Sequence, residues 1–98
     1  MKFNEDFEAK AELLKLLAHP VRLCIVKGLM DKSCNVSNMQ ECLKLPQSTV
    51  SQHLKVLKSG GIIKGTRNGL EIKYYISNES VKELVEFLFK ETEKLEVI

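Results

Sequence analysis

The segment from Gln47 to Lys58 carries the side chains best suited to chemistry in this 98-residue chain. Its apolar residues Val50, Leu54 and Leu57 recur at i, i+4 and i+7, which predicts one buried stripe on a helix. The rest of the segment has no acid and holds hydrogen-bonding and basic groups: Gln47, Ser48, Thr49, Ser51, Gln52, His53, Lys55 and Lys58. Glutamine can pair with adenine in the major groove, serine and threonine can bond base edges, and lysine can hold phosphates. These residues therefore predict a DNA-recognition helix.

An ordinary solvated helix face is the alternative interpretation, because any surface helix is polar on one side and a C-terminal lysine suits the helix dipole. The charge distribution favours nucleic acid. Net charge is −2 over residues 1–12, +7 over 13–75 and −3 over 76–98, within a total of +2. A basic middle between acidic ends is typical of a surface that meets a polyanion.

A short helix predicted over 36–43 precedes the recognition segment. The connection Lys44-Leu45-Pro46 is short and anchored by an apolar residue, as a helix-turn-helix requires. Residues 36–58 are thus expected to form this motif, with the second helix in the major groove.

A hairpin is predicted over 62–76, after Ser59-Gly60-Gly61 has ended the helix. The pattern changes to period two, and Asn68-Gly69 is a two-residue hairpin signal. We expect this hairpin to act as a wing whose polar and basic groups contact phosphates or a narrow minor groove: Lys64, Arg67, Asn68 and Lys73. Glu71 is the one nearby residue that fits this role poorly.

Three further helices are predicted, over 5–17, 20–30 and 79–95. His19-Pro20 separates the first two, with His19 as a cap and Pro20 in the first turn. Asn78 or Ser77 is suited to cap the last. The chain length fits one domain, 1–98, with a modest core that would gain from a partner chain.

Several other classes of protein are disfavoured. The N-terminus has early acids and no apolar core of a signal peptide, and no stretch is long enough to cross a membrane, so we expect a cytoplasmic protein. Three cysteines argue against a disulfide framework. The sequence contains no nucleophile–base pair, phosphate loop or carboxylate cluster, so neither an enzyme nor a cofactor is expected.

Three segments resemble the ArsR/SmtB repressors, and in particular the PagR-like branch that lacks metal ligands. They are L-A-H-P-V-R-L over 17–23, L-P-Q-S-T-V-S-Q-H-L-K-V-L over 45–57 and N-G-L-E-I-K-Y-Y over 68–75. The resemblance covers about residues 10–90. It implies a mainly α (α+β) fold: a homodimeric winged helix-turn-helix of five helices and a two-stranded β-hairpin wing.

The resemblance also implies roles for individual residues. Ser48, Thr49, Ser51, Gln52 and His53 would face the groove of double-stranded DNA. Helices within 1–18 and 78–98 would form the dimer interface, for which the candidates are Phe7, Leu14, Leu17, Val81, Leu84, Val85 and Leu88.

A metal site is disfavoured. The Cys-x-Cys site of the family is matched here by Asn35-Val36-Ser37, and the last predicted helix has no histidine. Cys34 and Cys42 are separated by eight residues, about 12 Å along a helix, which is too far to share one zinc ion.

A thiol switch involving Cys24 and Cys34 is the next hypothesis. Related sensors pair a cysteine in the second helix with one in the last, and the last helix here has none. Free structural cysteines are therefore the simpler interpretation, and Cys42 is expected in the core because it falls on an apolar face.

Three functions remain open at this stage. The first is a dimeric repressor that reads an inverted repeat with two recognition helices about 34–36 Å apart. The second is a dimeric protein-interaction winged helix without DNA binding, and the third is a thiol- or ligand-responsive sensor. The sequence does not identify an operator, a regulated gene or an effector.

Overall fold

A computed structural model describes residues 5–31 and 36–97, with side chains over 6–30 and 36–90. The elements are α1 (Glu5–Leu17), α2 (Pro20–Asp31), α3 (Val36–Leu43), α4 (Gln47–Ser59), β1 (Ile63–Asn68), β2 (Glu71–Ile76) and α5 (Glu79–Val97). This is the predicted order of five helices with a hairpin before the last. The helix starts agree with the prediction, and α2, α4 and α5 extend one or two residues further.

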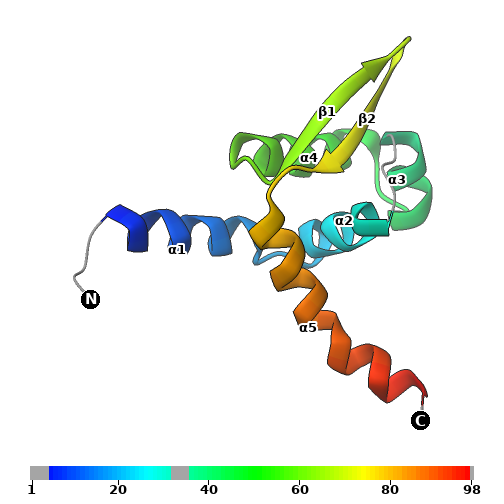
Figure 1. The fold of residues 1–98 in the computed structure, drawn as a ribbon. Coiled ribbons are helices and arrows are strands. Elements are labelled where there is room, and N and C mark those ends of the chain that lie inside the picture. Colours follow the sequence, from blue (N-terminus) through cyan, green and yellow to red (C-terminus); the bar gives the residue numbers. More distant parts are fainter. Residues whose placement is uncertain (1–4, 32–35, 98) are drawn as a thin grey trace.

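The core lies among α2, α3, α4 and the base of the hairpin. From this body α1, α5 and the hairpin project in three directions (Figure 1). The buried apolar residues come from all seven elements and from the α4–β1 link: Leu17, Ile25, Val26, Leu29, Met39, Val50, Leu54, Leu57, Ile62, Ile63, Tyr74, Val81 and Val85. Val50, Leu54 and Leu57 are among them, so the predicted buried stripe of α4 is confirmed.

Backbone hydrogen bonds set both ends of α4. At its start the carbonyl of Pro46 accepts bonds from the Thr49 and Val50 N–H groups, each at 3.1 Å. At its end the Gly61 N–H donates to the Lys58 carbonyl and the Ile62 N–H to the Leu57 carbonyl, the Schellman pattern. Leu57 and Ile62 are both fully buried. These contacts turn the chain directly from α4 into β1.

The hairpin turn lies one residue later than predicted. The antiparallel register pairs Asn68 with Glu71, so Gly69 and Leu70 occupy the turn and Asn68 is the last residue of β1. Gly69 has a φ of +68° and no such value occurs at Leu70. Glycine at the first central position is the pattern of a type II′ turn, whereas the predicted Asn-Gly turn needs positive φ at both positions. Leu70 consequently stands at the tip, 101% exposed.

Helix α5 begins at the predicted cap, because the Asn78 Oδ1 accepts a 3.1 Å hydrogen bond from the Val81 N–H. Val81 and Val85 are 0% exposed and Leu17 of α1 is 4% exposed. These three residues belong to the core of the protomer and have no surface to offer a partner, which corrects their predicted place in a dimer interface.

Apolar side chains remain exposed on the other faces of α1 and α5. Leu14 is 54% exposed and Phe7 40% on α1, while Phe87 is 70% and Leu88 53% on α5. Leu84 is half-buried. The radius of gyration is 14.6 Å, against about 12.5 Å for a typical chain of this length. The projecting helices thus leave apolar surface that the protomer itself does not cover.

Candidate nucleic-acid interface

Helix α4 divides into three faces. The first, formed by Val50, Leu54 and Leu57, is buried in the core. The opposite face is exposed and carries six of the predicted DNA-contacting residues: Gln47, Ser48, Ser51, Gln52, Lys55 and Lys58. This helix contains no acidic residue, so nothing on it repels a phosphate. The six side chains are therefore presented together, on the side away from the core.

The third face is a flank formed by Thr49, His53, Val56 and Gly60, spaced at i, i+4, i+7 and i+11. Each of these residues is half-buried. The His53 ring lies 4.5 Å from the ring of His19, centroid to centroid, and its Nδ1 lies 3.5 Å from Nη1 of Arg22. The structure thus places His53 against α2 and the α1–α2 connection. It shares this flank with Thr49, so these two predicted contact residues lie on a different face from the other six.

Burial lowers the pKa of His53 from its ordinary value of 6.5, and the nearby His19 and Arg22 lower it further. Each of these influences opposes protonation of the imidazole. His53 is therefore neutral near pH 7. His19 serves as the predicted cap, because its Nδ1 accepts a 3.1 Å hydrogen bond from the Val21 N–H.

The four predicted wing residues are all exposed, but on two faces. Side chains directly opposite each other in an antiparallel pair share a face. Arg67 pairs with Ile72, and Ile72 is half-buried against the core. Lys73 pairs with Thr66, and Lys64 pairs with Tyr75, on the other face. The cations of the wing therefore lie on both of its faces, with Arg67 and Lys73 toward the tip and Lys64 near the base.

The start of α4 and the wing line one hollow of about 260 Å³. Gln47 contributes from α4, Val36 and Ser37 from α3, and Leu70, Glu71, Ile72 and Tyr74 from the hairpin. The recognition helix and the wing thus form one surface. Glu71, which fitted poorly in the sequence, lies within that surface and places a negative charge beside Gln47.

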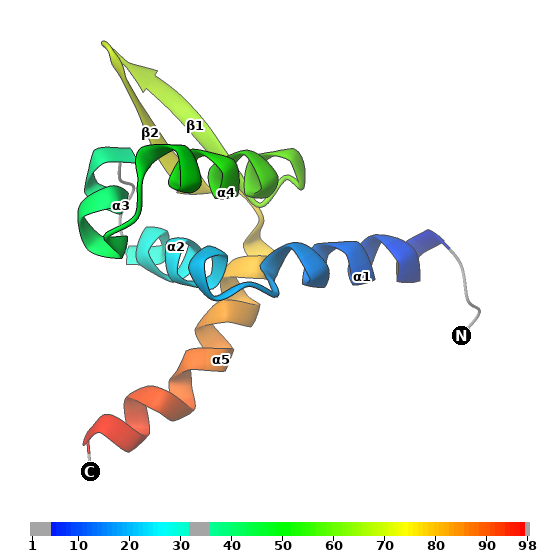
Figure 2. The same cartoon turned by 180° about the vertical axis from the view of Figure 1, so that it is seen from behind.

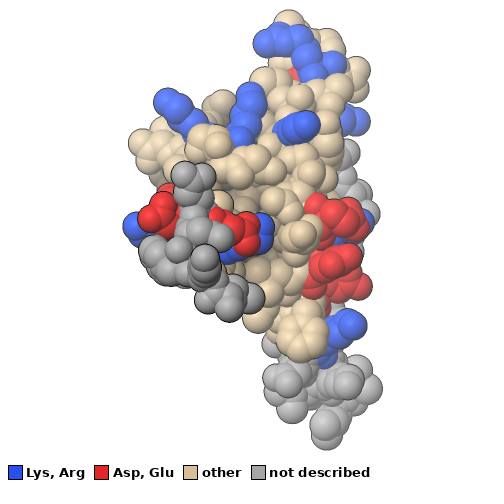
Figure 3. Space-filling view, turned by 60° about the vertical axis from the view of Figure 1, so that its left-hand side comes forward, with Lys and Arg blue, Asp and Glu red and all other residues tan. Residues whose placement is uncertain are grey.

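Charge is segregated on the face of the molecule that Figure 3 shows. Lysine and arginine dominate the upper part of Figure 3, which carries α4 and the wing, whereas the acidic groups gather lower down. This separation agrees with the predicted basic middle and acidic ends of the chain.

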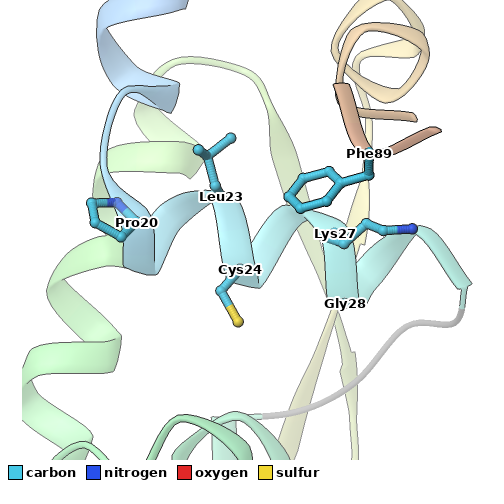
Figure 4. A pocket seen from close by; sticks show the side chains of 6 residues that line it. All are labelled: Pro20, Leu23, Cys24, Lys27, Gly28 and Phe89. Atoms are coloured by element: carbon cyan, nitrogen blue, oxygen red, sulfur yellow. The ribbon is translucent and has the colours of Figure 1, made fainter. Parts of the chain in front are cut away.

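The two cysteines that the structure describes, Cys24 and Cys42, are both free thiols. Cys24 is exposed and lines a hollow between α2 and α5 with Leu23, Lys27 and Phe89 (Figure 4). Cys42 is also exposed, which corrects its predicted place in the core. Its neighbour Leu43 is the residue that packs against the core there. Cys34 lies outside the described residues.

Over the described residues, no group of three or more histidine, cysteine or acidic side chains could hold a metal ion. None of the helices in the same part of the chain combines the length and the apolar character needed to cross a membrane.

Arg22 is a residue to which the sequence analysis assigned no role. Its Nη1 lies near His53, and its Nε donates to the backbone carbonyl of Leu16. The sequence offered one signal for this contact. Thr49, His53, Val56 and Gly60 recur at helical spacing, which predicts that this flank of α4 packs against another element.

A basic helix that follows a short helix, with a hairpin directly behind it, defines a winged helix-turn-helix domain. The comparisons with known proteins agree. Residues 17–66 match the family described as "Helix-turn-helix domain". The transcriptional repressor PagR of Bacillus anthracis is 50% identical over 84 residues, which cover 85% of this chain and 84% of PagR. Its crystal structure superposes with a TM-score of 0.78, covering 86% of this chain and 97% of that one.

Two other solved structures extend this likeness. HlyU from Vibrio cholerae has a TM-score of 0.86 at 30% identity, covering 90% of this chain and 96% of that one. The homodimeric winged helix-turn-helix domain of Mb0332 from Mycobacterium bovis, a possible ArsR-family regulator, has a TM-score of 0.80 at 27% identity. It covers 90% of this chain and 82% of that one. The chain belongs to the ArsR/SmtB family of winged helix-turn-helix transcriptional regulators.

Proposed function

We propose that this protein is a dimeric transcriptional repressor that binds an inverted-repeat operator in double-stranded DNA. Helix α4 would lie in the major groove and the wing on the adjacent backbone or minor groove. The observation that carries the proposal is the exposed face of α4, which presents hydrogen-bonding and basic side chains without an acid, opposite a fully buried stripe.

Each part of this surface has a distinct task in the proposal. Ser51 and Gln52 lie in the middle of the exposed face, where short polar groups and an amide can bond base edges. Lys55 and Lys58 lie toward the end of α4 and would hold phosphates, which fixes the register of the helix on DNA. Lys64, Arg67, Asn68 and Lys73 would extend the phosphate contacts along the wing.

The dimer is proposed from the uncovered apolar surface of α1 and α5. Leu14, Phe87 and Leu88 are each more than half exposed, and Mb0332 shows a homodimer in this fold. Two-fold symmetry would place two copies of α4 about one DNA turn apart, about 34–36 Å, which matches an inverted repeat.

Repression is assigned through the relatives. PagR, named a repressor, is 50% identical to this chain, whereas HlyU of Vibrio cholerae, named a transcriptional activator, is 34% identical. A dimer bound over a promoter would block access to it. We place this activity in the cytoplasm, because PagR is a bacterial protein and the chromosome of a bacterium lies in its cytoplasm.

The direct test is DNA affinity at several salt concentrations, with the thiols kept reduced. The protein's own upstream region is compared with scrambled DNA of the same length and composition. We expect preferential binding to the upstream region, with log K falling against log salt by about 0.9 per phosphate bound. Absent or sequence-indifferent binding would overturn the proposal and favour a protein-interaction role.

The dimer is tested separately by sedimentation. Leu14→Glu should shift the protein toward monomer, because it places a charge in the proposed interface. Leu70→Glu is the matched control, since this leucine is also exposed but lies at the wing tip. Equal behaviour of both variants would place the interface elsewhere.

A further inference from the structure

Three side chains meet beneath the flank of α4. The guanidinium of Arg22, on α2, donates through Nε to the carbonyl of Leu16 in the last turn of α1. Its Nη1 lies 3.5 Å from Nδ1 of His53 on α4. The His53 ring packs against that of His19, with centroids 4.5 Å apart and planes tilted by 50°. One guanidinium therefore connects the end of α1 to the recognition helix.

Both imidazoles serve as hydrogen-bond acceptors at Nδ1. An arginine can only donate, so Nδ1 of His53 must present its lone pair to Arg22. A backbone N–H likewise only donates, so Nδ1 of His19 must present its lone pair to Val21. The cluster thus places two imidazole acceptors next to each other, one of them beside the permanent cation of Arg22.

A second contact fixes the same flank further along α4. A β-carbon added to Gly60 would overlap the side chain of Leu16. With glycine at this position the end of α4 lies against the Leu16 side chain of α1 without requiring that side chain to shift. Helix α4 therefore rests on the last turn of α1 at Gly60 as well as through Arg22. Figure 2 shows α4 lying over α2, with the C-terminal end of α1 next to both helices.

We infer that Arg22 is a positioning residue for DNA recognition, holding α4 against the end of α1 through Leu16, His19 and His53. We call these contacts, of Arg22 with Leu16 and His53 and of His53 with His19, the brace. Because α1 is a proposed dimerisation helix, the brace would couple the geometry of the dimer to the position of the exposed face of α4. The inference rests on the proposed function for its effect on DNA. The brace itself can be measured without DNA.

Acid should release the brace. Protonation at Nδ1 would turn an acceptor into a donor facing Arg22 and add a charge beside a cation. The charged and titratable groups that act on His53 in the described structure are His19 and Arg22, and both lower its pKa, as burial does. Once released, His53 returns toward its ordinary pKa of 6.5 and binds a proton more readily. The braced state is therefore favoured above about pH 6.5 and lost as pH falls below it.

The first arm of the test measures affinity for the upstream region and for scrambled DNA between pH 8 and pH 5.5. We expect the ratio of the two affinities to fall by about tenfold in acid, the size of one hydrogen bond to a charged group. Added positive charge alone would strengthen binding to both DNAs and leave their ratio unchanged. A ratio that stays constant over this range would overturn the inference.

The second arm uses two conservative variants. Arg22→Lys keeps the charge but cannot make both interactions at once, so it should reduce the ratio at pH 7.5 by about tenfold without weakening binding to scrambled DNA. His53→Asn keeps an acceptor near Nδ1 but does not titrate, so it should retain the ratio at pH 7.5 and abolish most of the acid effect. An unchanged ratio in Arg22→Lys would contradict the brace.

The third arm needs no DNA. Amide hydrogen exchange at pH 7 should be faster along α4 in Arg22→Lys than in the wild type, with α5 as the internal reference. If the wild type shows no preference between the two DNAs, the proposed function fails, and this arm alone decides the brace. Unchanged exchange in α4 would overturn it.

Discussion

Helix α4 and the wing offer similar polar and basic side chains to solvent, but the fold holds them differently. Helix α4 is fixed on two sides, by the buried stripe through Val50 and Leu54 and by the flank that packs on α1 and α2. The wing is anchored along one face only, where Ile63 and Tyr74 are buried and Ile72 packs half-buried against the core. From Lys64 to the turn every residue is exposed.

How firmly each region is held determines which of them can read a DNA sequence. Base readout requires side chains held in a fixed position, because a misplaced hydrogen bond leaves a polar group unpaired. A phosphate contact tolerates more freedom, since the backbone charge repeats along the duplex. We therefore assign specificity to α4 and sequence-independent affinity to the wing, and the following predictions test that division.

The largest effect is expected from Ser51→Ala combined with Gln52→Ala. The fold should survive because both residues are exposed, while binding to the operator should weaken by about 1–3 kcal/mol for each base that is no longer read. Binding to scrambled DNA should not change, because no charge is removed. Titrations on both DNAs measure this, with Ser80→Ala on α5 as the control. Retained operator affinity would remove α4 from the readout.

The anchoring of the two regions is compared by Leu57→Ala and Leu70→Ala. Leu57 is 0% exposed beneath α4, and its truncation should cost about 2–5 kcal/mol of unfolding free energy. Leu70 is 101% exposed at the wing tip, and its truncation should change stability by less than about 0.5 kcal/mol. Urea denaturation followed by circular dichroism gives both values. Similar values would show that the wing is as tightly packed as α4.

Removing the wing lysines should weaken binding without changing specificity. In the double variant Lys64→Ala, Lys73→Ala, affinities for operator and scrambled DNA should fall by the same factor. The slope of log K against log salt should decrease by about 0.9 for each phosphate that the variant no longer neutralises. An effect confined to the operator would mean that the wing reads bases and would break the proposed division.

The smallest effect is expected at Glu71, the acid within the shared hollow of α4 and the wing. Glu71→Gln removes a charge that repels phosphate, so affinity for any DNA should rise by about two- to fivefold at low salt. The gain should vanish at high salt, where exposed charges are screened. Weaker binding would instead indicate that the Glu71 carboxylate makes a contact of its own.

The arrangement of elements could be predicted because each carries a strong local signal. The Val50, Leu54 and Leu57 spacing located α4, and Ser59-Gly60-Gly61 located its end. The hairpin was found from its change of period, but its turn was misplaced by one residue. Asn68-Gly69 and Gly69-Leu70 both offer glycine to a tight turn, and only the strand register decides between them.

Functional faces were harder to predict, because one sequence period does not separate two polar faces of the same helix. His53 and Gln52 are adjacent and both polar, yet Gln52 is exposed and His53 is half-buried. The partner of His53 is Arg22, which is 31 residues away in the sequence. Likewise Val85 and Leu88 are both apolar, and only tertiary packing shows that Val85 fills the core while Leu88 faces solvent.

Through the proposed dimer, the uncovered apolar side chains of α1 and α5 would link the stability of this protein to its abundance. In the proposed dimer a second copy would cover Leu14 and Phe87 and would bind the folded chain but not the unfolded one, so mass action would raise the melting temperature as protein concentration rises. A cell holding few copies would keep monomers that are both less stable and unable to span an inverted repeat. The response to changing expression would then be steeper than that of a monomeric regulator, because folding and operator occupancy would decline together.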